Sequence, residues 1–119
     1  MKTLVIVEHN NESIKQTTYS TITAASKISD EAYALILVNN LSTAIDELKK
    51  SNHLKKIYFV DKEVLGKPIA ENFCDEIIKF LIDKDFTHVF TPSSTFGKNL
   101  SPKIATELDV QQVSDIINI

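Results

Sequence analysis

The sequence predicts an α/β fold, a three-layer αβα arrangement around a mostly parallel sheet with strand order 3-2-1-4-5. Apolar strand-like runs alternate with helical patterns in the order βαβαβαβαβ, which is typical of a parallel sheet with right-handed crossovers. The 119 residues, 43% of them hydrophobic, match one domain with a buried core. We therefore expect residues 1–119 to form a single α/β domain.

Five short apolar runs are expected to form the strands. The first, at residues 4–7, is continuously apolar, as is typical of a strand covered by helices on both faces of the sheet. The later strands are expected at residues 32–38, 57–60, 89–91 and 113–119. No helical pattern follows the last run to cover it, and an uncovered apolar strand allows self-association.

Helical periodicity predicts the four connections. Ser13 and Gln16 match a capping box that opens a helix ending near Ile28. Ser42 is expected to cap the second helix, and Pro68 to lie in the first turn of the third. The residues expected to face the core are Ile14, Thr18, Ile22, Ala25 and Ile28 in the first helix, Ala44, Ile45 and Leu48 in the second, and Ile69, Phe73, Ile77 and Leu81 in the third.

The third and fourth helices carry further signals. Opposite the apolar face of the third helix, solvent-facing positions are expected for Glu71, Asp75 and Glu76. In the fourth helix, Pro102 predicts a kink or a late start near Leu100, because proline cannot donate a backbone hydrogen bond. The core-facing side of this helix is expected to carry Leu100, Ile104 and Leu108.

Charge and composition exclude several classes of function. The chain has 13 lysines, no arginine and 16 acidic residues, for a net charge of −3, so it lacks the basic footprint of a nucleic-acid-binding protein. The single cysteine, Cys74, lies in an apolar helical pattern and is expected to be buried and inert. No apolar run reaches membrane-spanning length and Met1 leads directly into a strand, which predicts a cytoplasmic protein.

The loop richest in hydroxyl groups is residues 91–99, TPSSTFGKN. It joins a strand to a helix and offers hydroxyls, a glycine and a lysine, which suit an anion or a neighbouring chain. A purely structural role is equally compatible, because its serines and threonine are good N-caps and the glycine allows tight packing. The candidate crevice or interface residues in it are Ser93, Ser94, Thr95, Phe96, Gly97 and Lys98.

With strand order 3-2-1-4-5, the loop after the first strand faces TPSSTFGKN across the point where strand order reverses. This first loop, EHNNES at residues 8–13, has no glycine, which disfavours a dinucleotide fingerprint or a P-loop. His9 joins the candidate crevice residues. We expect no catalytic role for it, because no acid and nucleophile accompany it.

Two further types of site are disfavoured by spacing. No metal-ligand spacing links His9, His53 and His88, so no metal site is expected. Asp61 ends the third strand, where receiver domains have their phosphoacceptor, but the acidic pair and the lysine that such a site requires are missing. We therefore expect no catalytic residues and no confident cofactor-binding residues in this chain.

Three segments resemble a known family. The run HVFTPSSTFGKNLSPKIATELDVQQVSDI, the opening LVIVEHNNESIK and the TITAASKI helix closely resemble the amino-terminal part of the electron transfer flavoprotein alpha subunit. The resemblance covers essentially the whole chain and implies an adenine-nucleotide alpha-hydrolase-like (Rossmann-like) fold. It also implies that the chain stops before the second domain, which carries most of the flavin site.

The resemblance implies a heterodimeric electron carrier. In that family, an alpha and a beta subunit hold one FAD and pass electrons from acyl-CoA and related dehydrogenases to a quinone oxidoreductase. This chain would serve as a scaffold and subunit-contact domain, without tightly bound FAD and without catalysis of its own. The alternative is a stand-alone nucleotide-binding domain of the universal-stress type. Such a domain is expected to have a glycine-rich phosphate loop after the fourth strand. The sequence disfavours this alternative, because Gly97 is the single glycine of that loop.

Overall fold

The structure is a computed structural model that describes the chain except residues 11, 40–42, 68, 111 and 114–115. The described residues form a six-stranded sheet with the order β3-β2-β1-β4-β6-β5. The first four strands pair in parallel, and β6 and β5 are antiparallel additions. The strands are β1 (Lys2–Ile6), β2 (Glu31–Val38), β3 (Lys56–Asp61), β4 (His88–Phe90), β5 (Gln112–Val113) and β6 (Ile116–Asn118).

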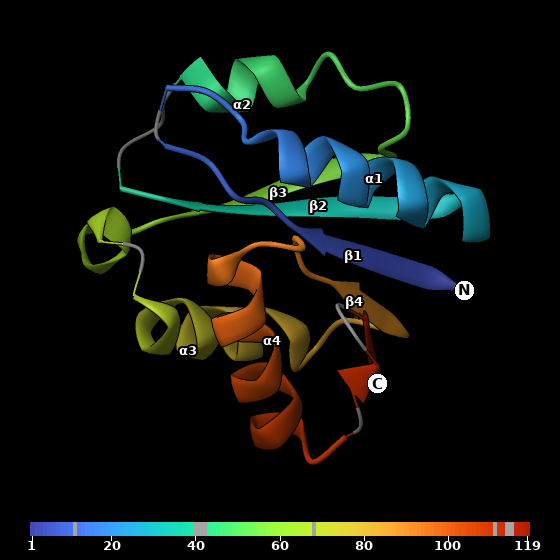
Figure 1. The fold of residues 1–119 in the computed structure, drawn as a ribbon, viewed down its shortest axis with the longest axis vertical. Helices are drawn as coiled ribbons and strands as arrows, with labels where there is room; N and C mark the ends of the chain where they lie inside the picture. The colour runs from blue at the N-terminus through green and yellow to red at the C-terminus, as the bar shows by residue number, and fades with distance from the viewer. Residues whose placement is uncertain (11, 40–42, 68, 111, 114–115) are drawn as a thin grey trace.

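Helices cover both faces of the sheet, as Figure 1 shows. On one face lie α1 (Gln16–Ile28) and α2 (Thr43–Leu48), and on the other lie α3 (Ala70–Leu81) and α4 (Thr95–Leu108). A short 3-10 helix, η1 (Glu63–Gly66), precedes α3. This arrangement confirms the predicted three-layer, mostly parallel α/β fold.

The central strand β1 contributes to the cores on both faces of the sheet. Side chains alternate across a strand, so Leu4 and Ile6 pack with α3 and α4, whereas Val5 and Val7 pack with α1 and α2. All four are completely buried. Residues 4–7, the end of β1 and the residue after it, can be continuously apolar because both faces of the sheet are covered here.

The last apolar run differs from the prediction of one strand at residues 113–119. It holds two short strands, and β6 runs antiparallel to β4, with Phe90 opposite Ile116. The polar residues Ser114 and Asp115, which divide the run in sequence, lie outside the described residues. The fifth position in the sheet, next to β4, is therefore occupied by β6. This strand runs antiparallel to β4 instead of parallel to it.

The two ends of the chain meet at Thr87. Its amide donates a hydrogen bond to the Lys2 carbonyl oxygen at 2.8 Å, and its carbonyl oxygen accepts one from the Ile119 amide at 2.9 Å. Both termini consequently lie on the same side of the molecule (Figure 1). This contact follows from the antiparallel direction of β6, which brings the chain back to the starting edge of β1 and β4.

The predicted capping box of α1 is wrong. The helix begins at Gln16 with Lys15 as its N-cap and without a capping side chain. The Ser13 amide and hydroxyl instead donate to Asn10 Oδ1, at 2.8 and 3.3 Å. Asparagine side chains compete in this way for nearby backbone groups and form turns. Ile28, expected in the core, is 52% exposed.

In α3 the prediction of an outward Glu76 is wrong. This residue is only 7% exposed, and its carboxylate pairs with Lys62 Nζ at 2.9 Å and Lys79 Nζ at 3.5 Å. Those cations offset the cost of burying the charge. Ile69, expected in the core, is the largely exposed N-cap. The expected positions of Ser42 and Pro68 lie outside the described residues.

The fourth helix starts earlier than Pro102 suggested. Ser94 is its N-cap, and α4 runs from Thr95 through Pro102 to Leu108. The predicted late start near Leu100 is wrong because the Ser94 side chain already caps the chain two turns upstream. The helix ends at Asp109, which adopts the left-handed conformation with φ 53°.

Candidate functional site

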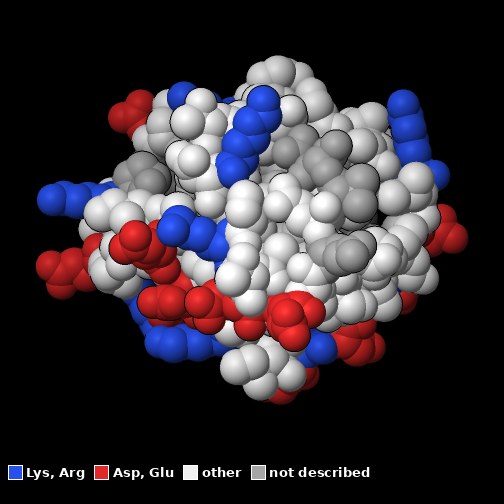
Figure 2. All heavy atoms as spheres, turned by 60° about the horizontal axis from the view of Figure 1, so that its bottom comes forward, with Lys and Arg blue, Asp and Glu red and all other residues white. Residues whose placement is uncertain are grey.

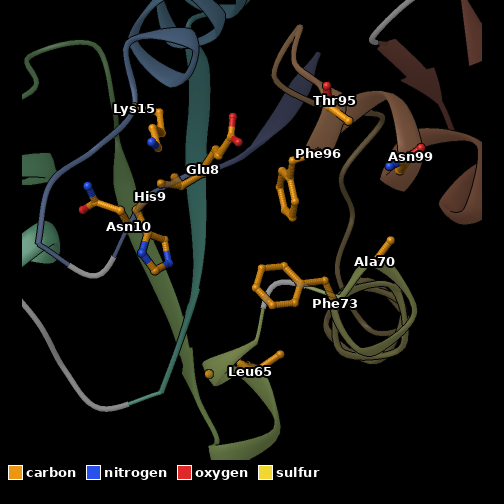
Figure 3. A pocket seen from close by; sticks show the side chains of 12 residues that line it. Glu8, His9, Asn10, Lys15, Leu65, Ala70, Phe73, Thr95, Phe96 and Asn99 are labelled. Carbon is orange, nitrogen blue, oxygen red and sulfur yellow. The ribbon is translucent and has the colours of Figure 1, made fainter.

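A cavity of about 500 Å³ opens at the carboxyl end of β1 (Figure 3). Its polar wall comes mainly from the loop at residues 8–15, here called the β1 loop, and the first turns of α4. The polar lining residues are Glu8, His9, Asn10, Lys15, Thr95 and Asn99. The remaining wall is formed by Val7, Leu65, Gly66, Ala70, Phe73 and Phe96.

The position of this cavity follows from the strand order. β1 lies between β2 and β4, and the chain builds the sheet first toward β3 and then, from β4, in the other direction. In open parallel sheets this reversal leaves a crevice outside the carboxyl ends of the two central strands, where ligands bind. The cavity occupies that crevice, between the β1 loop and α4.

Hydrogen bonds to α1 fix Glu8. The Thr18 hydroxyl accepts from the Glu8 amide at 2.8 Å and donates to the Glu8 carbonyl oxygen at 3.1 Å. The Thr17 hydroxyl donates to Glu8 Oε1 at 3.1 Å. The carboxylate therefore has a defined orientation at the cavity, since both its backbone and its side chain are held by the first turns of α1.

His9 is anchored to the neighbouring strand. Its Nε2 lies 2.8 Å from the Leu37 carbonyl oxygen, and because a carbonyl only accepts, Nε2 carries the proton and donates. The backbone of His9 also forms an antiparallel bridge with Ile14. The imidazole thus ties the β1 loop to the end of β2 while its ring lines the cavity (Figure 3).

In the loop at residues 91–94, here called the β4 loop, Ser94 is the N-cap of α4. Ser94 Oγ accepts a hydrogen bond from the Gly97 amide at 3.2 Å. A Cβ atom on Gly97 would lie 1.8 Å from the Pro92 carbonyl oxygen, so only glycine permits this close approach of loop and helix. Ser94 and Gly97 therefore shape the local backbone.

The candidate residues predicted from the sequence fall into three groups in the structure. His9, Thr95 and Phe96 lie together in the cavity wall. Ser93 lines a second groove, of about 420 Å³, formed with α1. Ser94, Gly97 and Lys98 are described but do not contribute to the cavity wall, and Lys98 is exposed to solvent.

Sequence reasoning included Phe96 but missed its aromatic partner in the cavity wall, Phe73. Phe73 on α3 meets Phe96 on α4 edge to face, with ring centroids 5.4 Å apart, and both rings border the cavity (Figure 3). Helical spacing identified Phe73 only as a core residue. No local signal distinguishes a core phenylalanine from one that also borders a cavity, because the difference depends on packing between distant segments.

The face that Figure 2 turns forward carries charges of both signs, with acidic side chains gathered mainly along its lower part. Among the described residues, no group of three or more His, Cys, Asp or Glu side chains could hold a metal ion.

Cys74 is buried in α3, and burial raises the pKa of its thiol, with smaller contributions from nearby acidic residues. A raised pKa leaves little reactive thiolate at neutral pH.

Residues 3–119 match the family described as "Electron transfer flavoprotein domain". The chain belongs to this family. Within the electron transfer flavoproteins it is 31% identical to subunit alpha of Pseudomonas aeruginosa over 119 residues, covering 100% of this chain and 38% of that protein. Against the mitochondrial alpha subunit of Dictyostelium discoideum it is 34% identical over 122 residues, covering 98% of this chain and 34% of that protein.

A probable mitochondrial electron transfer flavoprotein subunit alpha of Caenorhabditis elegans is 30% identical over 117 residues, covering 98% of this chain and 35% of that protein. The chain thus spans only about a third of the length of these curated relatives. None of the helices that the structure describes is long and apolar enough to cross a membrane.

Proposed function

We propose that the chain serves as the amino-terminal part of the alpha subunit of a heterodimeric, FAD-containing electron carrier. The carrier would pass electrons from dehydrogenases of fatty-acid oxidation to a quinone oxidoreductase in a bacterial cytoplasm. The observation that supports this proposal is the similarity to proteins named alpha subunits, which extends over 98–100% of the chain. Residues 1–119 would act together as one scaffold and subunit-contact domain, without catalysing a reaction.

The cavity residues do not fit an FAD pyrophosphate. A pyrophosphate cradle needs glycines that let backbone amides approach the phosphates closely. The cavity wall has a single glycine, Gly66, where a Cβ would already meet Asn39 Nδ2 at 2.7 Å, and Lys15 is its only lysine. We therefore propose that FAD is held outside these residues and that the chain alone does not retain it.

The exposed part of the 91–99 segment is proposed as a contact surface. Ser93, Thr95 and Lys98 are exposed, while Phe96 is half-buried between them and α3. Such a mixture of polar side chains around an aromatic ring is typical of interface patches. We propose that this segment faces the flavin-binding part of the carrier or the beta subunit.

Co-purification tests the proposed assembly. The chain, co-expressed with the beta subunit from the same genome, should be retained with it through affinity and size-exclusion steps. Lys98→Glu should reduce the retained beta subunit at least fivefold, because a reversed charge would enter the contact. The matched control is Lys27→Glu, at the exposed end of α1, which should leave retention unchanged.

A failure of wild-type chain and beta subunit to associate contradicts the assembly. Equal retention of Lys98→Glu and Lys27→Glu removes the 91–99 segment from the contact. Flavin retention is measured separately, by the absorbance near 450 nm of chain incubated with FAD and desalted. We expect no flavin to remain, and one FAD per chain after desalting would contradict the proposal that FAD is held elsewhere.

A further inference from the structure

We infer that the cavity at the carboxyl end of β1 binds a nucleoside, with its base against the Phe73 and Phe96 rings and its ribose at Glu8. This inference does not rest on the electron-carrier proposal, because it uses only the geometry of the cavity. It concerns a ligand of this chain itself, separate from the flavin.

The size and position of the cavity suit a small organic ligand. Its volume of about 500 Å³ lies within the range of about 300–1,000 Å³ typical of small-molecule sites. It also occupies the crevice at the reversal of strand order, where open parallel sheets bind their ligands. Both properties are independent of the chemistry of the lining side chains.

The wall is divided into an aromatic side and a polar side. The aromatic side has the edge-to-face pair of Phe73 and Phe96, with Leu65 below them in Figure 3. The polar side carries Glu8 and His9, which project from the β1 loop in the same view. A ligand that fills both sides needs a flat apolar ring joined to a group rich in hydroxyls, as in a nucleoside.

Glu8 is suited to hold a ribose. Its Oε1 accepts one hydrogen bond from Thr17 at 3.1 Å, and an ionised carboxylate has about four acceptor sites, so acceptor capacity remains for a diol. In dinucleotide-binding sheets an acidic side chain further along the chain hydrogen-bonds the ribose 2′-OH, and Glu8 offers the same chemical group shortly after β1. The hydrogen bonds from Thr17 and Thr18 orient this carboxylate in advance.

The charges of the wall favour a nucleoside over a phosphorylated ligand. Lys15 is the only lysine in the wall and Glu8 carries the opposite charge, so the two offset each other. The β1 loop segment EHNNES has no glycine to present backbone amides to a phosphate. Recognition should therefore come from the base and the ribose, with little contribution from any attached phosphate.

Isothermal titration calorimetry of the 119-residue chain tests the inference with adenosine, 2′-deoxyadenosine and AMP as probes. Adenosine should bind at least tenfold more tightly than 2′-deoxyadenosine, since a hydrogen bond to a charged group contributes about 1.5–3 kcal/mol and each 1.4 kcal/mol is tenfold. AMP should bind less than tenfold more tightly than adenosine.

Two variants separate the two sides of the cavity. Glu8→Gln keeps the shape of the side chain and should bring adenosine close to the affinity of 2′-deoxyadenosine. Phe96→Leu should weaken both nucleosides at least fivefold, because stacking on an aromatic side chain contributes about 1–3 kcal/mol per base. Ser93→Ala, in the second groove, is the control and should change neither affinity.

Three results would overturn the inference. One is the lack of any measurable binding of adenosine at millimolar concentration to wild-type chain whose circular dichroism is that of a folded α/β protein. Another is binding that Glu8→Gln and Phe96→Leu leave unchanged. The third is AMP binding more than tenfold tighter than adenosine, which would identify a phosphate site at Lys15 instead.

Discussion

The β1 loop and the β4 loop follow adjacent strands of the same sheet, yet they use their polar residues differently. In the β1 loop, Glu8 and His9 are held by α1 and β2 and present their side chains to the cavity. In the β4 loop, Ser94 caps α4, and the Pro92 carbonyl oxygen lies so close to Gly97 that no Cβ atom would fit there. Of these two polar loops, one therefore uses a hydroxyl to fix backbone geometry, while the other carries side chains that line the cavity.

The largest effect is expected at Gly97. In Gly97→Ala the added Cβ would lie 1.8 Å from the Pro92 carbonyl oxygen, so the β4 loop and α4 must move apart. We expect the free energy of unfolding in urea to fall by more than about 3 kcal/mol, at the upper end of the costs of overpacking.

Gly66→Ala is the matched control for Gly97→Ala. Its Cβ would meet Asn39 Nδ2 at 2.7 Å, the far end of a side chain that can turn away. Its cost should stay below about 1 kcal/mol, the usual scale of a tolerated change. Equal costs for the two variants would mean that the β4 loop is not a rigid backbone element.

A loss of stability smaller than that of Gly97→Ala is expected at Thr18, through which α1 supports the β1 loop. Thr18→Val keeps the shape of a completely buried side chain but leaves the Glu8 amide without its hydroxyl acceptor. An unsatisfied buried donor costs about 1–3 kcal/mol, so urea unfolding should show a loss near 2 kcal/mol. Thr23→Val, at an exposed position of α1, should cost less than about 0.5 kcal/mol, and a similar loss in both variants would contradict this role of Thr18.

Next in size is the N-cap of α4. Ser94→Ala removes the acceptor of the Gly97 amide and should lower the free energy of unfolding by about 1 kcal/mol, the usual value of such a cap. The neighbouring Ser93 is exposed, so Ser93→Ala should change stability by less than about 0.5 kcal/mol. A larger loss of stability in Ser93→Ala than in Ser94→Ala would mean that Ser94 is not the residue that caps α4.

The last effect concerns pH and acts at α1, the helix that supports the β1 loop. Burial raises the pKa of Tyr19 to about 12, and its hydrogen bond to Glu47 on α2 adds to the increase. The unfolded pKa is about 10, so the contribution of Tyr19 to stability is fully present below pH 10 and is lost as pH rises from 10 to 12.

Absorbance at 295 nm follows this titration directly. The chain has three tyrosines, and the highest-pH step of the titration curve should disappear in Tyr19→Phe. The same variant should lose stability less steeply between pH 10 and 12 than the wild type. A curve whose last step survives the substitution would assign the raised pKa to another tyrosine.

The fold could be predicted because its signals are local and periodic. Continuous apolar runs identified the buried strands, and their alternation with helices gave the order that places β1 beside β4. That order also brings the ends of these strands together, which is why His9 and Phe96 line one cavity. Their participation in binding or in subunit contact stays a prediction.

The features that were mispredicted depend on contacts between distant residues. Glu76 is polar in sequence, but Lys62 from the segment after β3 neutralises it inside the structure. In the sequence, Leu65 and Phe73 cannot be distinguished from ordinary core residues. They line the cavity because η1 and α3 lie close to α4 and the β1 loop in the folded chain. The same holds for β6, because its antiparallel pairing with β4 cannot be deduced from apolar patterning alone.

The hydrogen bonds of Thr87 to both Lys2 and Ile119 make the chain suitable for circular permutation. Joining the two ends through a short glycine-rich linker requires little displacement of either, because one residue already contacts both. New ends can be opened in the exposed turn at residues 52–53, before β3. Such a permutant should keep the cavity intact, since the cavity lies at the opposite, carboxyl ends of β1 and β4.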